Sequence, residues 1–92
     1  MNLYRVYLGQ KDGDLDYFGE TVEAKDAAEA TEKAYKYRLL YWQCAANMGR
    51  MKGYMDIFND LYNSSQVCSP QNYALEIRHY VENNVDCLVE LT

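Results

Sequence analysis

Three aspartates at alternate positions are the first residues in the chain that could take part in metal chemistry. Asp12, Asp14 and Asp16 have the spacing of the first ligands of a calcium-binding loop. Such a loop needs glycine at its sixth position, where this chain has Tyr17, and its twelfth position would be Glu23, on an expected strand. We therefore interpret the segment as a solvated turn, and we expect no metal or other cofactor.

The residues that could act as a nucleophile or a general base do not form a recognisable catalytic set. His79 is the only histidine, and it alternates with apolar residues if the surrounding segment is a strand. A half-buried structural histidine is the simpler interpretation. No serine or cysteine lies in a nucleophile motif, and Cys68 has no cationic neighbour in the sequence that would activate its thiol. We expect a protein that is not an enzyme.

The composition indicates a single globular domain over residues 1–92. The chain is 49% hydrophobic and 25% charged, which suits one modest core. Cys44, Cys68 and Cys87 are odd in number and form no CxxC pair, so we expect free thiols in a reducing compartment. We expect neither a membrane span nor a secretory signal, because no suitable apolar run is present. The expected location is the cytoplasm of a host cell.

The net charge of −5 conceals blocks of opposite sign along the chain. Residues 12–32 carry eight acids and one base, whereas residues 33–55 carry five bases and no acid. An acidic surface favours a basic partner, and a basic segment with interleaved rings favours nucleic acid. The sequence therefore points to two kinds of binding surface.

The N-terminal segment is typical of a β-hairpin. LYRVYLG alternates, with Tyr4, Val6 and Leu8 on one face, as in a strand. Asp12-Gly13 favours a hairpin turn, which requires positive φ. LDYFGETVEA is the expected return strand, and Glu20 interrupts its apolar face without an evident reason.

A long helix is expected over residues 26–48. Asp26 has the chemistry of an N-cap, and Glu29 three residues later completes a carboxylate form of the capping box. Gly49 is a suitable residue to end the helix. A second helix over residues 54–63 would cover apolar residues that lie off the main stripe. The stripe itself consists of Ala27, Ala30, Ala34, Tyr37, Tyr41, Ala45 and Met48.

The segment at 73–81 fits two structures. As a strand it would place Leu75, Ile77 and His79 on one face, and as a helix it would begin well at Ser69-Pro70. We favour the strand on β-propensity, with ENN as a hairpin loop and VDCLVEL as the last strand. The expected fold is a small α+β domain: a ββ hairpin, a long helix, a second helix and a C-terminal ββ hairpin, with the antiparallel sheet packed on the helices. The alternative is ββαααβ, with a third helix at 70–83.

The candidate binding residues come from the acidic block and from the start of the basic block. Acids not needed to cap the helix, together with nearby cations and rings, could contact a partner. These candidates are Asp14, Asp16, Glu20, Glu23, Glu32, Tyr35, Lys36, Arg38 and Trp42.

The first 48 residues resemble a group of known proteins. A strand LYRVYLG, a hairpin and TVEAKDAAEATEKA entering a helix are similar to the start of many small phage-encoded proteins, several anti-CRISPR proteins among them. Nothing after Gly49 matches a family pattern, and no functional residue is carried over by position. The resemblance implies a stoichiometric inhibitor of a bacterial CRISPR-Cas effector complex, which binds a basic nucleic-acid-binding surface and blocks recognition of target DNA.

Two further functions stay open at this point. One is a small nucleic-acid-binding accessory protein that uses the basic and aromatic segment 33–55. The other is a homodimeric phage structural or assembly factor. The expected partner is thus a protein, with a CRISPR effector complex as the implied one and direct contact with nucleic acid as an alternative. The protein would be a monomer or a homodimer, and no membrane partner is expected.

Overall fold

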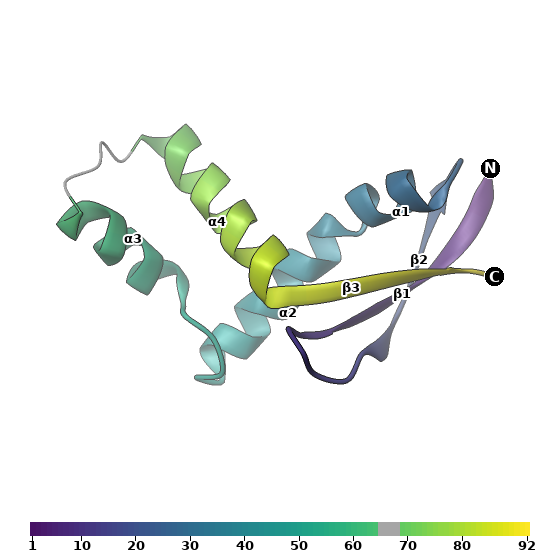
Figure 1. Ribbon diagram of the computed structural model, residues 1–92, viewed down its shortest axis with the longest axis horizontal. Helices are drawn as coiled ribbons and strands as arrows, with labels where there is room; N and C mark the ends of the chain where they lie inside the picture. The colour runs from purple at the N-terminus through teal and green to yellow at the C-terminus, as the bar shows by residue number, and fades with distance from the viewer. Residues whose placement is uncertain (65–68) are drawn as a thin grey trace.

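The computed structural model describes residues 1–64 and 69–92 and confirms a small α+β domain (Figure 1). Three strands form one antiparallel sheet in the order β2-β1-β3. The elements in chain order are β1 (Asn2–Gln10), β2 (Asp16–Ala24), α1 (Ala27–Lys33), α2 (Tyr35–Asn47), α3 (Tyr54–Asn63), α4 (Pro70–Asn84) and β3 (Val85–Leu91).

The expected N-terminal hairpin is confirmed, and its first strand lies at the centre of the sheet. Tyr4, Val6 and Leu8 are buried on one face of β1, as their alternation predicts. The turn adopts positive φ at Asp12, with a value of 63°. The hairpin therefore forms where the sequence places it.

A β-bulge in β2 explains why Glu20 interrupts an apolar face. The register shifts between Arg5 and Tyr7, so that three residues of β2 lie opposite Val6 alone. Gly19 sits in this bulge with φ of 86°, a conformation that glycine adopts without strain. Glu20 is one of the three residues opposite Val6, outside the regular pairing, and it is exposed there.

The expected long helix is two consecutive helices that meet at Ala34. Asp26 caps α1 as expected, and its Oδ1 accepts a 2.8 Å hydrogen bond from the amide of Glu29. Ala30 and Ala34 are fully buried, which allows close approach to the sheet. α2 then runs to Asn47, and Gly49 follows its C-cap residue with φ of 74°, as expected for that position.

The favoured strand at 73–81 is wrong, and the alternative third helix is correct. Ser69 caps α4 by accepting a hydrogen bond from the amide of Asn72, and Pro70 occupies the first turn. Tyr73, Ile77 and Val81 are buried at helical spacing. The N-cap and the helical spacing of the buried residues therefore outweigh the β-propensity of this segment. No C-terminal hairpin forms, because α4 passes directly into β3.

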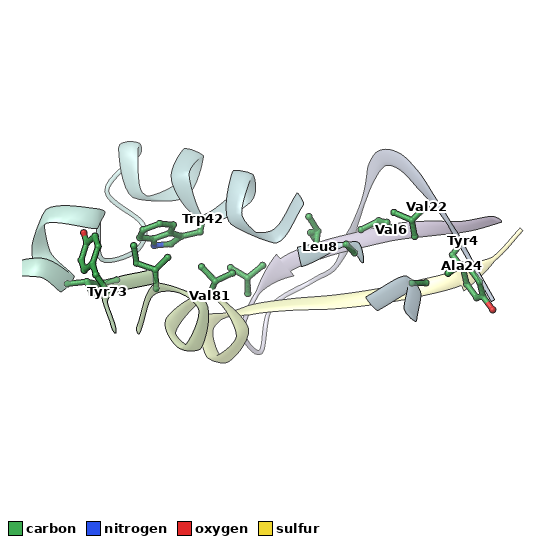
Figure 2. Packing of buried hydrophobic residues seen from close by; sticks show 13 residues of the cluster. Tyr4, Val6, Leu8, Val22, Ala24, Trp42, Tyr73 and Val81 are labelled. Carbon is green, nitrogen blue, oxygen red and sulfur yellow. The ribbon is translucent and has the colours of Figure 1, made fainter. Parts of the chain in front are cut away.

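The core is elongated, as the molecule is. The principal extents are 46 × 25 × 18 Å, with α3 at one end and the free ends of β1 and β3 at the other (Figure 1). Figure 2 shows the same arrangement in the buried residues: Trp42 and Tyr73 lie at one end, and Tyr4 and Ala24 at the other. The core thus continues from the sheet into an arm formed by α2, α3 and α4.

Candidate protein-binding surfaces

Trp42 anchors the arm. Its side chain is 1% exposed, and its indole Nε1–H donates a 2.7 Å hydrogen bond to the carbonyl oxygen of Lys52. Its ring lies 6.4 Å from the ring of Tyr54 and 6.2 Å from that of Tyr80, measured between centroids. These contacts join α2 to α3 and α4. The expected binding residue Trp42 is therefore part of the core of the arm.

Aromatic packing holds α3 against α4. The Tyr73 hydroxyl donates a 2.8 Å hydrogen bond to the carbonyl oxygen of Tyr54, and their rings meet edge to face at 4.6 Å. The Phe58 ring contacts Tyr73 in the same geometry at 5.7 Å. Ile57 is buried beside them. These contacts fix the orientation of α3.

Large apolar side chains of α3 remain partly open to solvent beside this packing. Met55 is 62% exposed, Phe58 37% and Tyr62 72%, and their spacing places them on one stripe. Single exposed apolar residues are ordinary, but a contiguous row of large ones marks an interaction surface. We call Met55, Phe58 and Tyr62 the α3 stripe.

Among the described residues, three neighbouring hollows share Tyr54 in their lining and lie on the surface of the arm. The largest has a volume of 730 Å³ and lies between α2 and α4. A second, of 420 Å³, lies between α3 and the start of α4, and a third, of 370 Å³, between the end of α2 and the start of α3. We call this surface the aromatic groove. Its main lining residues are Tyr35, Leu39, Trp42, Tyr54, Phe58 and Tyr73.

Arg78 forms the charged rim of the groove. Its guanidinium carbon lies 4.3 Å from the centroid of the Tyr35 ring, and its side chain also contacts the carboxylates of Glu32 and Glu82. Burial raises the pKa of Tyr35, and the positive charge of Arg78 partly opposes that rise. The expected binding residues Glu32 and Tyr35 therefore meet at this rim.

Four of the other expected binding residues lie along β2 and the turn before it. Asp14, Asp16, Glu20 and Glu23 are exposed, and no ion pair joins any of them to another residue of the described ranges. We call these four residues the acidic strip. Their charges remain available to a partner, although acids on an edge strand also discourage aggregation.

Several cations of the basic block have partners within the protein. Arg38 donates to the carbonyl oxygens of Val85 and Glu82, at 2.6 Å and 3.0 Å. Lys33 pairs with Glu29. Lys52 pairs with Asp60 in the same way. The remaining candidate, Lys36, lies over its neighbour Tyr37, 4.9 Å from the ring centroid. Most of these cations therefore already contact another residue of the protein.

His79 takes a different position from the one expected. The strand interpretation placed it half-buried among apolar residues, but α4 exposes its side chain beside a hollow of 410 Å³. Within residues 1–64 and 69–92, no group of three acidic, histidine or cysteine side chains could hold a metal ion. Cys68 lies outside the described residues, and Cys44 and Cys87 are free thiols.

The aromatic groove is the feature that sequence reasoning missed. The signal was present, because residues 54–62 carry apolar side chains on two sides of a helix. The sequence explains one of these sides as cover for the long helix and gives no role to the other. The groove also requires α4, which the strand interpretation of 73–81 removed.

Comparison with known proteins adds no family to this description. No protein-family model, curated protein or solved structure matches the chain significantly. Among the described residues, no helix is long and apolar enough to cross a bilayer.

Proposed function

We propose that this protein is a stoichiometric, non-catalytic inhibitor that binds another protein at a basic, nucleic-acid-binding surface. Its target would be a bacterial CRISPR-Cas effector complex in the cytoplasm of the host cell, and binding would block recognition of target DNA. The observation that carries the binding function is the aromatic groove together with the α3 stripe.

The groove has the composition of a protein-binding site. Aromatic side chains dominate the energetics of protein interfaces, and the lining of the groove includes Tyr35, Trp42, Tyr54, Phe58 and Tyr73 beside aliphatic residues. The rings are held in place by Trp42 and Tyr73, so a partner does not have to order them on binding. Apolar side chains of the partner would enter the groove, and the exposed side chains of the α3 stripe would be buried against the partner.

The acidic strip indicates the charge of the partner. Asp14, Asp16, Glu20 and Glu23 would attract a positively charged surface and raise the rate of encounter with it. CRISPR effectors hold nucleic acid in positively charged channels. The N-terminal resemblance to anti-CRISPR proteins supplies the choice of this target among basic proteins. The acidic strip would speed association with the partner, and the groove would supply the affinity.

Direct binding of nucleic acid receives less support. That function would need the cations of residues 33–55 on one exposed face. Instead, Lys33 and Lys52 pair with acids of the protein, and Arg38 binds backbone carbonyls. We therefore do not propose it.

A phage plating assay tests the function. Cells with a defined CRISPR system are challenged with a targeted phage, with and without this protein. We expect plating to recover with at least one effector type. A Met55→Ser, Phe58→Ser double variant should lose the effect, and Met48→Ser should keep it, because Met48 is exposed and apolar but lines none of the three hollows. No recovery across a panel of effector types would refute the CRISPR target.

A further inference from the structure

The sheet has two edges, and the β2 edge is closed. The bulge at Gly19 breaks the regular pairing pattern of the strand. Lys33 Nζ donates a 2.6 Å hydrogen bond to the carbonyl oxygen of Glu23. Bulges and charged side chains are devices that prevent another strand from pairing with an edge. An incoming strand would find this edge irregular and partly occupied.

The β3 edge has unused backbone groups at alternate residues. The amide of Thr92 donates to Leu3, and the amide of Lys11 donates to the carbonyl of Asn84. With the register of β1 and β3, this pattern directs the backbone groups of Asp86, Leu88 and Glu90 toward β1. The backbone groups of the alternate residues, which lie between these three, point away from β1. The outward set consists of Cys87, Val89 and Leu91.

No protective device closes the outward side of β3. Its pairing with β1 is regular over seven residue pairs, and its sequence VDCLVEL has no proline or lysine. Within the described residues, no hydrogen bond reaches the outward groups of Cys87, Val89 or Leu91. Arg38 occupies only the carbonyl of Val85, at the start of the strand. In Figure 1, no helix passes in front of β3.

We propose that β3 receives an additional β-strand from a basic partner protein. Main-chain hydrogen bonds to an exposed edge give such complexes their affinity, and alternate side chains give specificity. On the outer face β3 presents Asp86 and Glu90 on either side of Leu88. Glu90 pairs with Arg5 at 3.4 Å but its side chain stays 54% exposed, and Asp86 accepts a hydrogen bond from the amide of Asp12. Both keep their negative charge, so the incoming strand carries cations opposite them. On the inner face it carries apolar residues, which extend the row of Cys87, Val89 and Leu91.

A second copy of the chain fits this edge less well than a basic strand. Full antiparallel overlap of β3 with itself would place Asp86 opposite Glu90 of the other copy, twice in the pair. Like charges directly opposite one another destabilise a strand pair. Each copy also carries a net charge of −5. Charge therefore favours a basic occupant.

The test uses a synthetic peptide, acetyl-Lys-Val-Lys-Val-Lys-Val-Lys-amide, and amide hydrogen exchange measured by NMR. In the free protein, the amides of Cys87, Val89 and Leu91 should exchange faster than those of Leu88 and Glu90. Saturating peptide should slow the outward amides by roughly tenfold or more and leave the others unchanged. The same peptide with Glu in place of Lys should have no effect. Absence of alternate protection at millimolar Lys peptide would overturn the proposal.

Two proline variants give the matched control. Val89→Pro removes an outward amide of β3 without removing a bond to β1, and Thr21→Pro does the same at the outer side of β2. Val89→Pro should abolish peptide protection, and Thr21→Pro should retain it. Equal loss in both folded variants would contradict the proposal. If Val89→Pro does not fold, an Asp86→Asn, Glu90→Gln variant should weaken peptide binding about tenfold, and unchanged affinity would contradict it.

This inference does not rest on the proposed function. The Met55→Ser, Phe58→Ser variant leaves β3 intact and should bind the Lys peptide with unchanged affinity. A protein that forms a dimer at low concentration, with its outward β3 amides protected in the absence of peptide, would assign the edge to a second copy and overturn the basic-strand proposal.

Discussion

The Trp42 indole N–H donates a 2.7 Å hydrogen bond to the carbonyl oxygen of Lys52, ten residues later in the chain. This bond holds the segment between α2 and α3 against α2, and the Trp42 ring itself is almost fully buried. The orientation of α3, and with it the shape of the aromatic groove, depends on this contact and on the Tyr73 hydroxyl bond to Tyr54.

Substitutions of Trp42 separate the hydrogen bond from the packing. Trp42→Phe removes the donor and leaves the Lys52 carbonyl without it, so we expect a loss of about 1–3 kcal/mol in the free energy of unfolding. Trp42→Ala also removes the ring and should cost about 3–5 kcal/mol. Urea unfolding measures both. Equal stability of the Phe variant and the natural protein would show that the bond does not hold the connection.

Gly9 tests the close approach of β1 to the turn that follows it. A Cβ at this position would overlap the backbone carbonyl oxygen of Asp14, which cannot rotate away as a side chain can. Gly9→Ala should therefore cost about 1–3 kcal/mol. Gly53→Ala is the control, because the nearest atoms to its Cβ would lie at 3.8 Å and 3.9 Å. Similar losses in the two variants would contradict this explanation.

How far the sequence predicts this fold can be judged from particular residues. The sequence predicts β1, the start of α1 and the end of α2 correctly. Alternation, the Asp26 cap and Gly49 each act through neighbouring residues, so these elements can be read locally. The strand expected at 73–81 is wrong because the strand and helix patterns of this segment are both apolar, and only the Ser69 cap and the packing of α4 on α2 decide between them. The aromatic groove depends on three helices meeting, which no single segment encodes.

The acidic strip and the basic block show a second limit of sequence reasoning. Charge counts find both, but they do not show which charges are already paired. Glu32 is bound by Arg78, and Arg38 is directed into the start of β3, although both are ordinary charged residues in the sequence. The distinction requires the positions of helices that lie far apart along the chain.

Cys87 makes stability sensitive to alkaline pH. Burial raises the pKa of its thiol above the ordinary value, and the charge of Arg38 opposes that rise to a smaller extent. The thiol therefore ionises at lower pH in the unfolded chain than in the folded protein. Its contribution is complete below the unfolded pKa and is lost as the pH rises through the folded pKa.

Urea unfolding between pH 7.5 and 10.5 measures this effect. The stability difference between the natural protein and Cys87→Ala should change steadily above about pH 9, to the disadvantage of the natural protein. Cys44→Ala is the matched control, because Cys44 is an exposed free thiol. A difference for Cys87→Ala that does not vary with pH would show that the thiol does not titrate differently on folding.

Arg78 links α1, α2 and α4 at the rim of the groove. A double-mutant cycle with Arg78→Ala and Glu32→Ala should give a coupling below about 1 kcal/mol, because the Glu32 side chain is largely exposed. Arg78→Ala alone should be more destabilising, since it also loses the Tyr35 ring and Glu82. Arg50→Ala, an exposed cation of the same kind, should cause no measurable change. A coupling that accounts for the whole Arg78 effect would exclude the stacking contribution.

Calorimetric titration into purified CRISPR effector complexes tests most directly whether the aromatic groove is a protein-binding surface. We expect one type to bind one copy per site with submicromolar affinity, weaker at high salt because of the acidic strip. Met55→Ser with Phe58→Ser should weaken binding at least tenfold and Met48→Ser should not. Effector binding that the groove variant leaves unchanged, or no binding to any type, would contradict the account.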